Sequence, residues 1–187
     1  MKNSPEKHHR RSIRLKDYDY SQEGGYFITI CTFNRECLFG DVVNGQMCLN
    51  EIGRVVVDEW TSSGRIRKEI GLDEFIVMPN HLHGVVIITE SNVVGATGRS
   101  PLQRGPRPKS LGAFIAGFKS AATKRINELC GTPGEPIWQR NYYEHVVHDE
   151  HELNDIREYI AKNPLKWEMD GENPRNNLSV KSFSILA

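Results

Sequence analysis

The chain has little that would suit a membrane protein or a disulfide-rich one. Its sequence contains no apolar run near the ~18 residues that a membrane-spanning helix needs. The basic, polar N-terminus has no apolar segment of the kind found in secretory signals. The four cysteines show no C-x-x-C spacing, which disfavours a zinc finger, and three lie in strand-like segments where burial is expected. We therefore expect no membrane partner and a reducing, cytoplasmic location.

The chain also has no net charge, because 24 Lys and Arg residues balance 24 Asp and Glu residues. The charges are nevertheless separated along the sequence: residues 1–16 hold a lone acid, Glu6, and residues 91–127 hold none. Two basic segments suit a polyanion bound at a defined surface, although solvated segments without a partner are the alternative. The candidate nucleic-acid contacts on this charge map are Arg10, Arg11, Arg14, Arg99, Arg104, Arg107, Lys109, Lys119 and Lys124.

The length of 187 residues suits a single domain with one core. We expect a basic, flexible arm over residues 1–17, the domain over 18–170 and a polar tail over 171–187. Within the domain, residues 90–109 are rich in Gly, Pro, Ser and Arg, which predicts a flexible basic loop.

Hydrophobic periodicity and turn residues predict the elements of this domain. Strands are expected at 25–33, 72–78, 81–88 and 137–148, with a hairpin over 38–49 around Asn44-Gly45. Helices are expected from Asn50 to about Gly64, from Ser110 to Gly131 with Leu129 on the apolar stripe, and from Asp149 to Pro164. This order predicts an α+β, ferredoxin-like sandwich: an antiparallel sheet with helices on one face, an extra β-hairpin and a C-terminal helix.

Two histidines begin one of the predicted strands, in the segment Met78-Pro-Asn-His-Leu-His-Gly-Val-Val-Ile-Ile88. Side chains alternate along a strand, so His81 and His83 point to the same face. Two neutral imidazoles on one face can ligate a divalent ion together with a third ligand from another element. The plainer interpretation is a pair of partly buried histidines that hydrogen-bond to the backbone.

The last predicted helix carries Tyr159 and, one turn later, Asn163. A tyrosine beside a metal-bound phosphate can act as a nucleophile, and an amide oxygen can be the third metal ligand. Alternatively, Tyr159 is the aromatic edge of an amphipathic stripe and Asn163 an ordinary helix-end residue. Tyr142 and Tyr143 compete for the nucleophilic role, but a strand aromatic more often packs in a core or stacks on a base. The remaining histidines of this region, His145, His148 and His151, are interpreted as surface or phosphate-contacting groups.

The motifs Met78-Pro-Asn-His-Leu-His83 and Tyr159-Ile-Ala-Lys-Asn-Pro164 closely resemble the two signatures of single-tyrosine HUH transposases. Within that family the chain is most similar to the REP-associated tyrosine transposases and to the transposases of the smallest insertion sequences. The resemblance continues through Arg10-Arg-Ser-Ile-Arg-Leu-Lys-Asp-Tyr-Asp-Tyr20, Phe27-Ile-Thr-Ile-Cys31 and Trp138-Gln-Arg-Asn-Tyr-Tyr-Glu-His145. It covers roughly residues 10–170, with the motifs in the family's order.

The resemblance implies a function and a role for each motif residue. It assigns Tyr159 as the catalytic nucleophile and His81, His83 and Asn163 as ligands of Mg²⁺ or Mn²⁺. The implied reaction is nicking and strand transfer of single-stranded or hairpin DNA through a 5′-phosphotyrosine. The resemblance also implies a palindromic-repeat target and a homodimer. A non-catalytic regulator that binds hairpin DNA or RNA on the same fold is the alternative, and a metal-binding domain without a DNA role is a weaker one.

Overall fold

The computed structural model describes residues 22–89 and 109–176. The predicted arm 1–17, most of the predicted loop and residues 177–187 of the predicted tail lie outside the described residues. The same holds for six of the candidate nucleic-acid contacts, namely Arg10, Arg11, Arg14, Arg99, Arg104 and Arg107.

Four antiparallel strands form the central sheet in the order β4-β5-β1-β6. Leaving out the inserted β2–β3 hairpin, this is the strand order of a ferredoxin-like fold, which confirms the predicted fold class. The elements are β1 (Gly24–Cys31), η1 (Phe33–Arg35), β2 (Gly40–Val43), β3 (Gln46–Leu49), α1 (Glu51–Ile66), β4 (Ile70–Met78), β5 (His81–Ile88), α2 (Leu111–Cys130), β6 (Tyr143–Val147), α3 (Glu150–Lys162) and η2 (Asn163–Met169).

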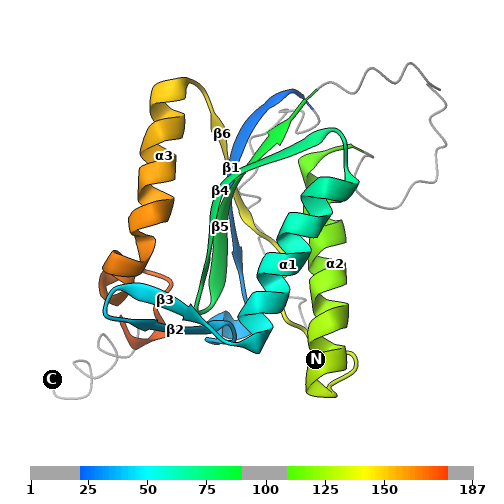
Figure 1. Cartoon of the computed structure of the whole chain (residues 1–187), viewed down its shortest axis with the longest axis vertical. Helices are drawn as coiled ribbons and strands as arrows, with labels where there is room; N and C mark the ends of the chain where they lie inside the picture. Colours follow the sequence, from blue (N-terminus) through cyan, green and yellow to red (C-terminus); the bar gives the residue numbers. More distant parts are fainter. Residues whose placement is uncertain (1–21, 90–108, 177–187) are drawn as a thin grey trace, which may run out of the picture.

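The helices divide between the two faces of this sheet (Figure 1). Helices α1 and α2 cover one face, and the hydrophobic core lies beneath them, built from alternate residues such as Ile28, Leu82 and Val86. Helix α3, which is the C-terminal helix expected from the sequence, lies on the other face. Residues of β5 that alternate with the core positions therefore point toward α3. Among the described residues, no helix is long and apolar enough to cross a membrane.

Some local predictions were wrong. The predicted strand at 137–148 is regular only over Tyr143–Val147, because the carbonyls of Gln139 and Asn141 accept from the Lys119 ammonium group instead of a neighbouring strand. Leu129 is exposed, and the buried apolar residue on that turn of α2 is Ile126. The cysteines are not buried either: Cys31 is intermediate, and Cys37, Cys48 and Cys130 are exposed.

The hairpin and α1 meet at a junction that admits only a glycine. The Asn50 side chain caps α1 by accepting from the Gly53 amide at 2.9 Å. At the same place the Phe39 backbone oxygen would lie 2.2 Å from a Cβ on residue 53. Backbone atoms on both sides cannot yield as a side chain can, so this close approach sets the position of the hairpin against α1.

We expect Gly53→Ala to lower the free energy of unfolding by roughly 1–3 kcal/mol, as overpacking against backbone does. The matched control is Gly117→Ala in α2, where a Cβ would meet the movable end of the Arg67 side chain at 2.8 Å. That variant should gain up to about 1 kcal/mol from its higher helix propensity. Urea unfolding of both proteins makes the comparison, and equal effects would contradict the packing argument.

Candidate metal and tyrosine site

Strand β5 places His81 and His83 side by side in the middle of the sheet. It lies between β1 and β4, so His83 is flanked by Thr29 and Ile76 in the strand register. The two rings have centroids 4.4 Å apart, and the residues are 0% and 4% exposed. The prediction that both imidazoles share one face is confirmed. Because hydrogen bonds on both edges hold the strand, the pair sits on a rigid support.

A single hydrogen bond determines how His81 presents its ring. Its Nδ1 lies 2.9 Å from the Asn80 side-chain oxygen, while the Asn80 amide nitrogen donates to the Arg35 and Glu172 carbonyls at 3.0 and 2.7 Å. Those two donations orient the amide, so its oxygen must accept and His81 Nδ1 must donate. Nε2 of neutral His81 then carries the lone pair. It is buried and has no hydrogen-bond partner among the described residues.

His83 links the sheet to α3. Its Nδ1 lies 2.8 Å from the Thr29 hydroxyl, and its Nε2 lies 3.3 Å from the Tyr159 hydroxyl. The Phe27 ring stacks on the imidazole with centroids 5.5 Å apart and meets the Tyr159 ring edge-on at 6.0 Å. These contacts hold the His83 ring from two directions and bring the tyrosine oxygen next to a potential ligand atom.

Burial keeps both imidazoles neutral. Desolvation lowers the pKa of His81 to about 3, with the positive charge of Arg35 adding to the effect. Desolvation also lowers the pKa of His83 to about 3, and the neighbouring His81 acts in the same direction while Asp170 opposes it. A neutral imidazole is the form that binds a metal ion, so near pH 7 neither ring has to lose a proton first.

Asn163 directly follows α3 and keeps helical dihedral angles, φ −56° and ψ −43°, so it remains one turn from Tyr159. It is 2% exposed, and its side-chain oxygen is buried without a hydrogen-bond partner among the described residues. Burial and the charge of Asp170 raise the pKa of Tyr159, whereas a hydrogen bond from Asn163 lowers it. The Tyr159 side chain is therefore a protonated phenol near neutral pH, and it is 41% exposed.

One further group at the site, Asp170, was not predicted from the sequence. A ligand atom of Asp170 and one from each of His81 and His83 lie within 4.8 Å of one another. Asp170 ends η2, and its carboxylate accepts from the Glu172 amide at 2.7 Å. No spacing rule relates this carboxylate to the strand histidines, because a 3₁₀ turn after Pro164 brings it back to the sheet.

An open cleft of about 520 Å³ lies in front of Tyr159 and His83. Phe27, Tyr143 and Gln139 line it, together with Arg35, which pairs with Glu172 at 3.0 Å. Tyr143 is 44% exposed here, while Tyr142 lies under the Lys119 ammonium group at 5.6 Å from the ring centre. Exposed aromatic faces beside a guanidinium group are suited to stacked bases and a phosphate.

The described candidate contacts differ in their surroundings. The Lys119 ammonium group is partly buried and donates to two carbonyls, and desolvation lowers its pKa to about 8. Lys119 thus has a structural role that the charge map did not predict. Lys124 is exposed on α2, 3.9 Å from Glu128, and Lys109 is exposed just before α2 with a left-handed φ of 60°.

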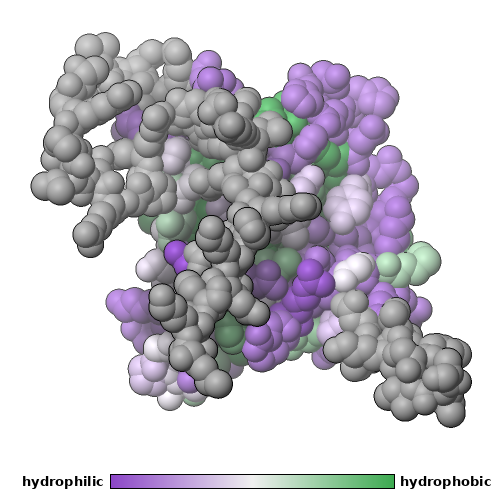
Figure 2. Space-filling model, turned by 180° about the vertical axis from the view of Figure 1, so that it is seen from behind, coloured by the Kyte–Doolittle hydropathy of each residue, from purple (hydrophilic) through white to green (hydrophobic). Residues whose placement is uncertain are grey.

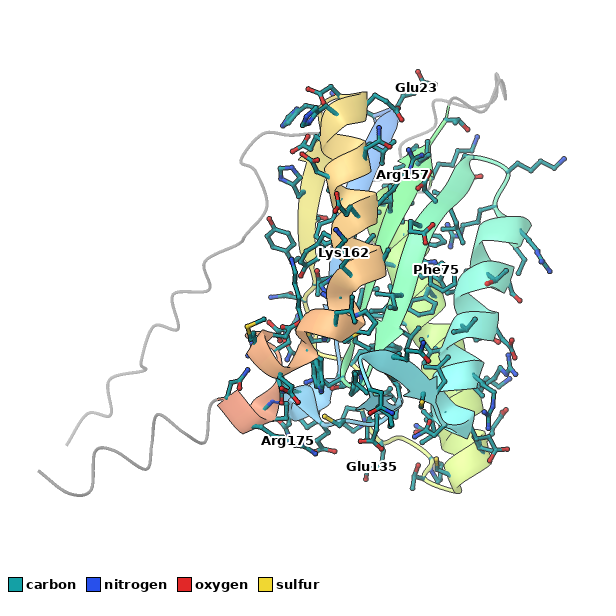
Figure 3. The ribbon with its side chains drawn as sticks, turned by 60° about the vertical axis from the view of Figure 1, so that its left-hand side comes forward. Glu23, Phe75, Glu135, Arg157, Lys162 and Arg175 are labelled. Carbon is teal, nitrogen blue, oxygen red and sulfur yellow. The ribbon has the colours of Figure 1, made fainter. Side chains whose placement is uncertain are left out.

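Polar contacts help to hold helix α3 on the sheet. Its surface seen from behind is mainly hydrophilic (Figure 2), and Ile160 is its one fully buried residue. Arg157 lies on the side of α3 that faces β4 (Figure 3) and donates to both carboxylate oxygens of Asp73 at 2.8 and 2.7 Å. A β-bulge between Leu72 and Phe75 turns Asp73 toward the helix. This ion pair lies half a turn from Tyr159 and so helps to fix the position of the phenol.

Comparisons with known proteins bear on the family and the fold of the chain. No family model matches the chain. An uncharacterized protein of Haemophilus influenzae is 42% identical over 171 residues, which cover 87% of this chain and 92% of the relative. The chain belongs to the same family as that protein. A REP-associated tyrosine transposase, solved bound to a REP hairpin, matches 82% of this chain and 73% of its own with a TM-score of 0.56 and 17% identity. The chain therefore has the fold of that transposase.

Arg157→Ala should loosen α3, because it removes both bonds to Asp73 at once. We expect faster amide hydrogen exchange along α3 and little change in β1 and β5. Lys162→Ala is the matched control, since Lys162 is exposed on the same helix and pairs with Glu158 one turn away. Equal rates of amide hydrogen exchange along α3 in the two variants would show that the Arg157–Asp73 pair does not anchor the helix.

Proposed function

We propose that this protein cleaves and rejoins single-stranded or hairpin DNA, with Tyr159 as the nucleophile and a divalent ion beside it. The observation that carries the proposal is a pair of buried, unpartnered ligand atoms, His81 Nε2 and Asn163 Oδ1, around the His83–Tyr159 contact of 3.3 Å. Buried polar atoms without partners are costly in a folded protein. Their presence together, next to an exposed phenol, is explained by a ligand that all of these groups share.

The residues present fit a divalent metal ion. His81 Nε2, His83 Nε2, the Asn163 amide oxygen and the Asp170 carboxylate would hold it. Two nitrogens with oxygen donors suit Mn²⁺ well and also allow Mg²⁺. When bound, the ion would neutralise charge on the attacked phosphate and leave positions open for its oxygens.

Tyr159 would carry out the covalent step. Its oxygen attacks the phosphorus of a DNA phosphodiester, the bond from phosphorus to the 3′ oxygen breaks, and the phenol gives up its proton. The products are a 5′-phosphotyrosine and a free 3′-hydroxyl. Attack by another 3′-hydroxyl on the phosphotyrosine rejoins strands and restores the phenol, so no external energy source is needed. The contact with His83 and the Asn163 amide holds the phenol in place for this attack.

The DNA would enter through the cleft that leads to Tyr159. Phe27 and Tyr143 offer ring surfaces for bases, and Arg35 and Gln139 offer donors for the backbone. The charge map adds further candidate phosphate contacts, namely the arm residues Arg10, Arg11 and Arg14 and the loop residues Arg99, Arg104, Arg107 and Lys109. The REP-associated transposase with this fold was solved on a REP hairpin, which supports a palindromic hairpin as the substrate.

A hairpin-binding regulator without catalysis is the second candidate on this fold. It would need the cleft and the basic segments but neither neutral buried histidines nor an unpartnered Asn163 oxygen. The site therefore favours the enzyme. A homodimer is proposed with it from the family resemblance, and a cytoplasmic location from the cysteine pattern.

Tyr159→Phe should abolish the covalent adduct with a labelled single-stranded hairpin in Mn²⁺, because only the attacking oxygen is removed. Hairpin affinity should stay nearly unchanged. Tyr143→Phe is the matched control, since it removes a phenol oxygen from the same cleft. Denaturing gels read the adduct. An adduct that persists in Tyr159→Phe and is lost in Tyr143→Phe would move the nucleophile to Tyr143.

Asp170→Asn should weaken Mn²⁺ binding by at least about tenfold, as loss of a charged metal ligand does. Glu172→Gln is the control, because that neighbouring carboxylate pairs with Arg35. Mn²⁺ titrations followed by electron paramagnetic resonance measure both affinities without any DNA. An Asp170→Asn protein that binds Mn²⁺ like the Glu172→Gln protein would remove Asp170 from the proposed ligands.

A further inference from the structure

A second group of potential metal ligands lies at the opposite end of α3 from Asn163. It consists of His145 on β6, His148 just after β6 and Glu152 in the first turn of α3. One ligand atom from each lies within 4.8 Å of the other two. His145 is paired with Phe27 in the strand register, so it projects from the sheet face that α3 covers. The proposed DNA chemistry uses none of these three residues.

The present contacts already hold a carboxylate between the two histidines. Glu152 Oε1 lies 2.7 Å from His145 Nε2, and Glu152 Oε2 accepts from the His148 backbone amide at 2.7 Å. The His145 and His148 rings face each other nearly perpendicularly, with centroids 5.9 Å apart. The amide bond from His148 and the contact with His145 hold the pKa of Glu152 below its usual range, so the carboxylate is ionised.

The ligand atoms of His145, His148 and Glu152 need to move little to bind an ion. Zinc bonds nitrogen and oxygen ligands at about 2.0–2.2 Å in a tetrahedron, so neighbouring ligand atoms end about 3.3 Å apart. The His145–Glu152 contact would widen slightly, and the exposed His148 ring would rotate inward. Glu152 Oε2 could keep its bond from the His148 amide, which would orient the carboxylate in the way that outer hydrogen bonds orient metal ligands. The partial exposure of all three groups leaves a fourth position for water.

We propose that His145, His148 and Glu152 form a second metal site, which takes a zinc-class transition-metal ion and ties the first turn of α3 to β6. Two imidazoles with one carboxylate suit zinc rather than magnesium or calcium, which take oxygen ligands. With the ion bound, α3 is fastened at both edges of the sheet, to β6 through the metal and to β4 through the Arg157–Asp73 pair. The site thus steadies the helix that carries Tyr159.

His148→Ala tests the site cleanly. It removes a ligand ring, but it leaves the His148 backbone amide that holds Glu152 and the Asp149 side chain that caps α3. The control is His151→Ala, which changes another exposed histidine, one in the first turn of α3 that pairs with Asp155 outside the cluster. The full chain is titrated with Zn²⁺ by calorimetry and with Co²⁺ by visible absorption. Counting bound ions separates this site from the His81–His83 pair, whether or not that pair takes up zinc.

We expect His148→Ala to bind one ion fewer than the wild-type chain, or to bind it at least about tenfold more weakly, and His151→Ala to match the wild type. A Zn²⁺-dependent rise in Tm should shrink in His148→Ala as well. Three results would overturn the site: a wild-type chain that binds no Zn²⁺, a His148→Ala chain with wild-type stoichiometry and affinity, or equal losses in both variants. These zinc-binding measurements do not depend on DNA cleavage, so they test the second site even if the protein proves not to cleave DNA.

Discussion

The hydrogen bond between Asn80 and His81 is the contact on which the candidate site depends most. Asn80 is fully buried in the turn between β4 and β5, and its amide group ties three segments that are distant in sequence: η1, β5 and the segment after η2. Its oxygen fixes the His81 tautomer, so Nε2 faces the site with a lone pair. Without that bond the imidazole could turn its N–H inward, and the pair of histidines would lose half of its capacity to bind a metal ion.

Positioning of the nucleophile is a separate matter and rests on how α3 docks. Besides its buried Ile160, α3 is placed on the sheet by directed polar contacts: Glu152 with His145 at the β6 edge and Arg157 with Asp73 at the β4 edge. Such contacts set orientation more than they add stability. Between them, Tyr159 packs against Phe27 and reaches His83. The sheet thus supplies the two histidines from a rigid strand, and α3 supplies the tyrosine from a helix whose position depends on its side-chain contacts.

The parts of this arrangement that follow from local pattern could be predicted from the sequence. Alternation along β5 placed His81 and His83 on one face, and the capping residues Asn50, Ser110 and Asp149 marked where the three helices begin. Asp170 and Arg35 could not be found in this way, because a 3₁₀ segment and two left-handed residues at Asn34 and Arg35 bring them to the site. The late start of β6 also escaped prediction, since Lys119, a residue of another element, takes the carbonyls of Gln139 and Asn141 just before the strand.

The central claim is that a divalent ion binds between the two strand histidines, next to Tyr159. Anomalous diffraction from crystals grown with Mn²⁺ tests it most directly, because it locates the ion without relying on activity. We predict a strong peak about 2.2 Å from Nε2 of both His81 and His83, with an oxygen of Asn163 or Asp170 among the remaining ligands. Crystals that show Mn²⁺ elsewhere, with His81 Nε2 still lacking a partner, would contradict it.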